Sequence, residues 1–371
     1  MSNYMSQYNA ANLIDKLADN DLIEPNRELN AFIINQQQAK EIPLYIRVLI
    51  GIGAFIASLC FIAFLAEAKI IRFDKEAGLI VWGLIFVVMA IALQKQAGED
   101  SSIKHSIFIQ ISFTAMAIGK GLFISGVTQI FDSSWGLSLA TLIITGLTYH
   151  LYRMSIDRFL SSFVFIFSLL VNILWAEEVS GTRALLFNGF FLFQMLCAAV
   201  LLTHGKIKSD YIPLSYAFVF SLCASILFLA SHTEFGYWNN DELIHPAFVN
   251  IILAGGLIAL IGWASGGLQN LKNEALILAS LGTVLLGIFS APGIILAIGL
   301  MILGYAKHES LLIILGGLLT PVFLFIFYYN LDISLMYKSG ILFVSGLVLL
   351  AGRVYLHYKN WDKGALSCVQ K

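Results

Sequence analysis

The chain has 371 residues, of which 58% are hydrophobic and only 12% are Asp, Glu, Lys or Arg. Its mean hydropathy is +0.83 and its formal net charge is −1. Soluble domains carry about 25% charged residues, so this composition excludes an ordinary soluble globular protein. The small net charge and the lack of a basic block give no reason to expect nucleic acid as a partner.

Residues 1–43 form the only sizeable polar segment. Apolar positions such as Leu13 and Phe32 predict two short amphipathic helices, with a break at Pro25. A segment this short cannot bury a core by itself. We interpret it as a cytoplasmic helical arm, which either lies on the membrane domain or docks a partner. The first apolar run begins near Leu44, and we expect the first membrane helix itself to act as the targeting signal.

Twelve apolar segments follow, each near the ~20 residues that cross a ~30 Å hydrocarbon layer as a helix. They cover residues 44–66, 77–93, 105–125, 135–152, 158–176, 184–203, 211–231, 246–264, 274–289, 291–305, 309–330 and 336–357. The ninth and tenth are short and meet near Pro292, so they are either two spans or a re-entrant pair. We predict an all-α, polytopic transmembrane helical bundle of about twelve spans (10–12), with a membrane domain at 44–357 and a tail at 358–371.

Positive charge predicts the orientation, because Lys and Arg accumulate in cytoplasmic loops. With the N-terminus inside, sixteen Lys and Arg fall on inside segments and five on outside loops, and Lys120 remains within the membrane. Trp and Tyr residues also gather near the predicted outer ends, as in an interfacial belt. Both termini, including the tail, are therefore predicted to be cytoplasmic.

Lys120 lies between two glycines inside the third apolar segment. At ~1.5 Å per residue it stands about 24 Å up its helix from Lys104, in the outer part of the membrane. One interpretation is that the side chain reaches the outer interface or forms a structural ion pair. For such a pair the sequence offers Asp132, Glu177 and Glu178 as partners at a similar depth.

The other interpretation of Lys120 is a polar pocket. Gln110 lies on the same face of its helix, and three asparagines fall in the outer halves of other segments: Asn172, Asn188 and Asn250. Ionisable residues inside a membrane are candidates for function. Together these residues would line an outward-facing pocket for an anionic group, and Lys120→Met would abolish activity without loss of folded protein.

Patterns of enzyme chemistry are missing from the chain. It contains no GxSxG, no HExxH and no Walker-type glycine-rich loop, and none of its four cysteines forms a CxxC pair. We therefore expect no enzyme activity, no cofactor and no metal site. The alternative for a metal is the predicted outer loop near 231–245, which holds His232 and His245.

The stretch FYYNLDISLMYKSGILFVSGLVLLAGR resembles the end of an uncharacterised bacterial membrane family, domain of unknown function 4401. The positions that match the family pattern are Tyr328, Tyr329, Leu331, Leu335, Lys338, Ser339 and Gly346. The stretch GKGLFISG around Lys120 is similar to the middle of that family and of the related family 2157. The resemblance implies a place in the bacterial inner (plasma) membrane. It also implies a partner with a GDYXXLXY motif, because members are often encoded beside such proteins.

Three functions remain open. The short loops, the arm and the implied partner favour a membrane component or scaffold, which is our first choice. A transporter-like carrier is the alternative, favoured by the polar pocket and by Pro321, which should kink the eleventh segment. Twelve of the thirty glycines fall at 255–317, including Gly262-x-x-x-Gly266, and they should let helices approach closely. A membrane-embedded transferase is third.

Overall fold

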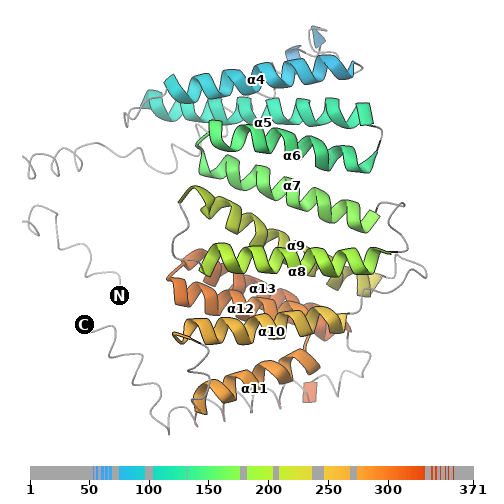
Figure 1. Ribbon diagram of the computed structural model, residues 1–371, viewed down its shortest axis with the longest axis vertical. Coiled ribbons are helices and arrows are strands. Elements are labelled where there is room, and N and C mark those ends of the chain that lie inside the picture. Colours follow the sequence, from blue (N-terminus) through green and yellow to red (C-terminus); the bar gives the residue numbers. More distant parts are fainter. Residues whose placement is uncertain are drawn as a thin grey trace, which may run out of the picture. The chain divides into compact units, whose positions relative to one another are not determined.

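The computed structural model describes residues 75–96, 103–131, 133–175, 182–203, 209–235, 246–267 and 274–330, with scattered positions in 53–68 and 336–354. In this part of the chain every regular element is a helix, which confirms the all-α class (Figure 1). The predicted arm at 1–43, the tail at 358–371 and most of the first and twelfth predicted spans lie outside the described residues. The chain divides into two compact units, Met1–Ser168 and Leu169–Lys371.

The first unit contains α4 (Glu76–Gln96), α5 (Ile103–Phe131), α6 (Ser134–Leu151) and the first part of α7 (Ser155–Trp175). Ser133 caps α6, because its hydroxyl accepts a hydrogen bond from the Trp135 amide at 3.2 Å. Neighbouring helices α4, α5 and α6 pack side by side around a core that includes Leu79, Met116 and Ile144, none more than 1% exposed (Figure 1).

The second unit continues from α7 through the remaining helices. These are α8 (Arg183–Thr203), the short 3₁₀ helix η2 (Ser209–Tyr211), α9 (Ile212–Phe235), α10 (Pro246–Ala264), α11 (Glu274–Phe289), α12 (Pro292–Lys307) and α13 (Ser310–Asn330). The second to eleventh predicted segments therefore each coincide with one described helix.

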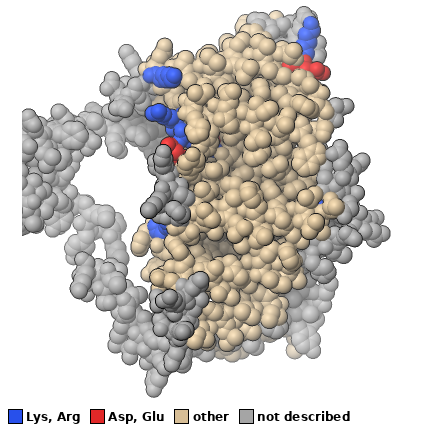
Figure 2. All heavy atoms as spheres, in the orientation of Figure 1, with Lys and Arg blue, Asp and Glu red and all other residues tan. Residues whose placement is uncertain are grey.

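Length and hydropathy make seven of the described helices long and apolar enough to cross a membrane: α4, α5, α7, α8, α9, α10 and α13. The apolar helices α6, α11 and α12 are shorter. Large apolar side chains point outward along these helices, as with Val88 (65% exposed) and Ile251 (69%). Figure 2 shows one face on which almost all described side chains are uncharged. Such surfaces suit lipid, so the chain has the features of a membrane protein.

The short ninth and tenth segments form two separate helices, α11 and α12, of 16 residues each. Pro292 begins α12, where its missing N–H costs nothing. The Asn250 amide of α10 donates to the Ser290 carbonyl at 3.0 Å and so holds the break between the two helices. Each helix is about 24 Å long, shorter than a typical span.

One predicted packing motif is wrong. Gly266 of the Gly262-x-x-x-Gly266 pattern lies beyond the end of α10, with φ +89°, and belongs to a turn. The left-handed backbone there favours glycine, so Gly266 ends the helix instead of bringing two helices together. Close approach in this unit occurs at other glycines, above all Gly304 and Gly316 between α12 and α13.

A buried glutamine joins α8 to α9. The Gln194 amide donates to Ser221 Oγ at 2.8 Å and accepts from Ser225 Oγ at 3.0 Å, and all three residues are 0% exposed. Hydrogen bonds between membrane helices contribute about 0.6 kcal/mol each. Gln194→Leu should therefore lower the free energy of unfolding by about 1 kcal/mol, measured by denaturant titration in detergent micelles.

The control for Gln194→Leu is Thr283→Val. Thr283 is also buried, but its hydroxyl donates to the Ala279 carbonyl of its own helix at 2.9 Å. This variant should change the stability by less than half as much. Equal losses in the two variants would contradict a stabilising role for the contact between α8 and α9.

Candidate functional site

A buried ion pair joins α5 to α7 in the first unit. Lys120 Nζ donates to Asp157 Oδ2 and to Ser161 Oγ, both at 2.6 Å. The side chains of Lys120 and Asp157 are 9% and 5% exposed. Asp157 lies in the first turn of α7, where the positive end of the helix dipole also favours a carboxylate. The pair is therefore neutralised within the bundle.

Arg158 adds a second cation beside this pair. Its Nε donates to the Tyr149 carbonyl at 2.9 Å, and its guanidinium carbon lies 5.1 Å from the centroid of the Tyr149 ring. Arg158 is only 6% exposed. Stacking on the ring and the bond to the backbone compensate for part of its lost hydration. The cluster of Lys120, Asp157 and Arg158 thus holds two cations and one carboxylate.

Hydroxyl groups tie the same region to α4. Ser112 Oγ donates to the Ala90 carbonyl at 2.7 Å and lies 3.0 Å from the Tyr152 hydroxyl, between α6 and α7. The phenol therefore connects α4, α5 and the α6–α7 connection without adding charge.

Small polar side chains also join α6 to α7. Ser138 Oγ and Ser168 Oγ lie 2.9 Å apart, and Thr145 Oγ1 donates to the Ser161 carbonyl at 3.4 Å. Ser161 is the residue that also accepts from Lys120. Hydrogen bonds of this kind fix the rotation of each membrane helix about its own axis. The Lys120–Asp157 pair is thus part of a polar seam that runs along α7.

The two glycines beside Lys120 have different surroundings. A Cβ atom on Gly119 would lie 2.7 Å from the Gly83 carbonyl oxygen of α4, whereas one on Gly121 would meet nothing within 4 Å. Gly119 therefore lets α5 lie directly against α4. Because neighbouring residues on a helix are about 100° apart, the next side chain, Lys120, projects away from α4 and reaches α7.

The predicted partners of Lys120 were Asp132, Glu177 and Glu178, all of which lie outside the described residues. The structure pairs Lys120 with Asp157 instead, and the sequence reasoning missed this residue. The predicted span begins at residue 158 and so leaves out Asp157, whereas α7 begins at Ser155 and includes it in its first turn.

The other predicted pocket residues are dispersed among several helices. Gln110 lies on α5 about 15 Å along the helix axis from Lys120. Asn172, Asn188 and Asn250 belong to α7, α8 and α10 in the second unit. Within the described part of the chain, the side-chain carbonyls of Asn188 and Asn250 are buried without a hydrogen bond. A pocket that joins these residues to Lys120 stays a prediction.

The family-like motif begins at the end of α13. Tyr328 and Tyr329 have ring centroids 6.1 Å apart, and Tyr329 is 63% exposed. Ser339 Oγ donates to the Met336 carbonyl at 2.8 Å, while Lys338 lies outside the described residues. These contacts are local to the chain, and the motif belongs to the second unit.

No group of three or more His, Cys, Asp or Glu side chains that could hold a metal ion occurs among the described residues. The loop at 236–245, which includes the predicted alternative ligand His245, lies outside them. The expected lack of a metal site therefore stays a prediction.

Comparison with known proteins identifies a family. The model of the family described as "Domain of unknown function (DUF4401)" matches residues 43–359 and so covers most of the chain. No curated protein and no solved structure matches. The match confirms the resemblance seen at Tyr328 to Gly346 and extends it over α4 to α13.

Proposed function

The chain belongs to the DUF4401 family, and from this premise we propose that it is a membrane component or scaffold that acts with a partner protein. In this role the chain is a multi-pass protein of the bacterial inner membrane, with about twelve spans and both termini in the cytoplasm. It includes no catalytic step. The proposed partner is a GDYXXLXY-type membrane protein.

The observation that supports this role is the closed Lys120–Asp157 pair. An anion receptor needs a cation whose charge is available to the ligand, but Lys120 already donates to Asp157 and Ser161. Both side chains of the pair are also covered. Such an arrangement fixes α5 against α7. It suits a rigid bundle that presents the same surface to its partner at all times.

A transporter-like carrier is the second candidate, because ionisable groups inside spanning helices often mark a pathway. Lys120 extends toward the first turn of α7, where Asp157 lies. Under the predicted topology this end of α7 is cytoplasmic. A carrier built on this pair would therefore open inward, in contrast to the outward-facing pocket expected from the sequence.

A tagged pull-down from native membranes in mild detergent separates the two functions. The component role predicts one partner in stoichiometric amount, identified by mass spectrometry as a GDYXXLXY-type protein. The same partner should be recovered with the control variant Lys95→Gln, which changes an exposed cation at the end of α4.

A protein that purifies alone and monodisperse would contradict the component role. The carrier would then be tested by flux of small anions into proteoliposomes. Flux that Lys120→Met abolishes and Lys95→Gln preserves would establish the carrier, provided that both variants remain folded.

A further inference from the structure

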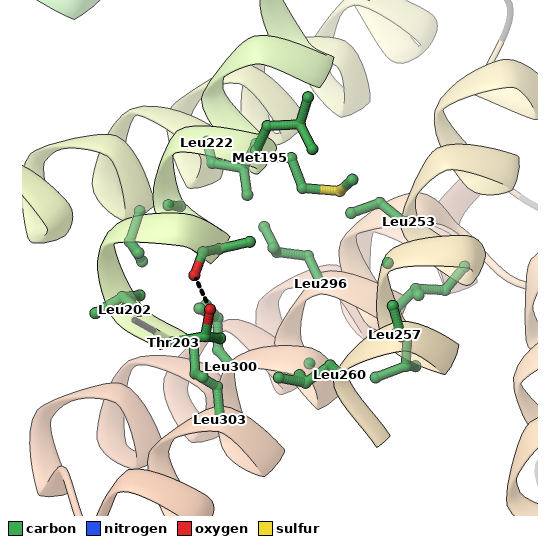
Figure 3. A pocket seen from close by; sticks show the side chains of 18 of the residues that line it. Met195, Leu202, Thr203, Leu222, Leu253, Leu257, Leu260, Leu296, Leu300 and Leu303 are labelled. Carbon is green, nitrogen blue, oxygen red and sulfur yellow. Dashed lines mark hydrogen bonds between the residues drawn. The ribbon is translucent and has the colours of Figure 1, made fainter. Parts of the chain in front are cut away.

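A second feature, remote in the chain from Lys120, is an apolar pocket in the second unit. It has a volume of about 330 Å³, within the range of small-molecule sites, and residues of α8, α9, α10 and α12 line it. The lining is almost wholly aliphatic, and Thr203 is its one hydroxyl (Figure 3). That hydroxyl already donates to the Ala199 carbonyl at 2.7 Å. Apart from the indole N–H of Trp263, the side chains of the walls therefore offer little to a polar ligand.

The two ends of the pocket differ. Met195, Leu222 and Leu253 lie together at one end in Figure 3, whereas Thr203 and Leu303 lie at the other. Thr203 is the last residue of α8, and Leu303 lies in the last part of α12. The second end of the pocket is thus the place where these two helices finish.

A cation lies just beyond this second end. Lys307 ends α12, four residues after Leu303 and therefore on the same face of the helix. Lys307 Nζ lies 5.6 Å from the centroid of the Trp263 ring, and Trp263 itself lines the pocket. Tryptophan and lysine at the end of an apolar helix are typical of the membrane interface.

From these neighbours we infer that the pocket binds one glycerophospholipid, with an acyl chain among the leucines and its phosphate at Lys307. An apolar pocket of this kind favours an acyl chain over water. The ammonium at its rim supplies the charge that a phosphate needs. Among the described residues near this end, Glu309 is exposed and accepts from the Tyr216 hydroxyl at 3.1 Å. That hydrogen bond engages Glu309, while Lys307 lies beside the ring that lines the pocket.

The test is native mass spectrometry of the detergent-purified, delipidated full chain. It is incubated with phosphatidylglycerol or with a diacylglycerol that has the same two acyl chains but no phosphate. The wild type should bind one phosphatidylglycerol about fivefold more tightly than the diacylglycerol. Lys307→Gln should remove this difference, while binding of the diacylglycerol stays unchanged.

A second variant tests the chain-binding part of the pocket. Gly299 lines it, and a Cβ there would meet only Leu257 Cδ1, at 3.8 Å. Gly299→Leu should place a bulky side chain in the pocket and weaken the binding of both lipids by more than about tenfold. Gly255→Leu is the matched control, because Gly255 is exposed, has nothing within 4 Å and does not line the pocket.

Three results would overturn the inference. They are equal binding of the two lipids by the wild type, an unchanged preference in Lys307→Gln, and unchanged binding in a Gly299→Leu protein that elutes as the wild type does. If Gly299→Leu does not fold, the Lys307→Gln comparison alone decides, because it changes only a residue at the end of α12.

Discussion

Replacement of Lys120 by Met should lower the free energy of unfolding by about 3 to 5 kcal/mol, because the Asp157 carboxylate then stays buried without its cation. Asp157 is 4% exposed, so water cannot replace the lost ammonium. Ser161 is a poor substitute, since a hydroxyl supplies a hydrogen bond and no charge. Asp157→Asn should cost a similar amount, because it leaves the Lys120 ammonium unpaired. Denaturant titration in detergent micelles measures both variants.

The double variant Lys120→Met/Asp157→Leu separates the cost of an unpaired charge from the value of the pair. Replacement of a buried ion pair by apolar residues of similar size is often neutral or stabilising. Most of the lost stability should therefore return in the double variant. Lys95→Met, at an exposed position, is the control for loss of a lysine. Single variants that are as stable as the wild type would contradict the buried pair.

Sequence periodicity and hydropathy predicted the helices well, because a span must be both long and apolar. The boundaries failed where polar residues occur within a helix. The third segment was predicted to end at 125, but α5 continues to Phe131. Thr128 allows this, because its hydroxyl donates to the Ile124 carbonyl of the same helix at 2.7 Å. A hydropathy average counts such a residue as polar although its bond is satisfied.

The predicted depth of Lys120 depends on where the membrane begins along α5. The prediction counted from Lys104 as if the membrane began there, yet α5 has 29 residues and is about 43 Å long. A hydrocarbon layer is about 30 Å thick, so part of this helix lies outside it. The structure places Lys120 within reach of the first turn of α7. The predicted partners were chosen for an outer position and therefore excluded Asp157.

Contacts between helices could not be predicted from single segments. Gln194 meets Ser221 and Ser225 only because α8 and α9 have a particular rotation about their axes. An apolar segment in lipid shows little contrast between its faces, so the sequence gives little information on that rotation. The same limit applies to contacts made by glycines. The sequence shows that glycines gather at 255–317, but it does not predict which of them touch another helix.

Adjacent glycines in α13 should respond to the same substitution with opposite signs. A Cβ on Gly316 would lie 2.7 Å from the Ala297 carbonyl oxygen and 3.1 Å from the Met301 amide nitrogen, both backbone atoms of α12. Backbone cannot move aside as a side chain does, so α12 and α13 must separate. Gly316→Ala should therefore lower the free energy of unfolding by about 3 kcal/mol, the upper end of the cost of overpacking.

Gly317→Ala is the matched control, because Gly317 is exposed and a Cβ there would meet nothing within 4 Å. Its only effect should be to reduce the freedom of the unfolded chain, which raises the stability by about 0.5 to 1 kcal/mol. Denaturant titration of the two variants beside the wild type gives both signs in one experiment. If Gly316→Ala also gained stability, α12 and α13 could not be in backbone contact, and the wall that α12 contributes to the apolar pocket would have to be placed differently.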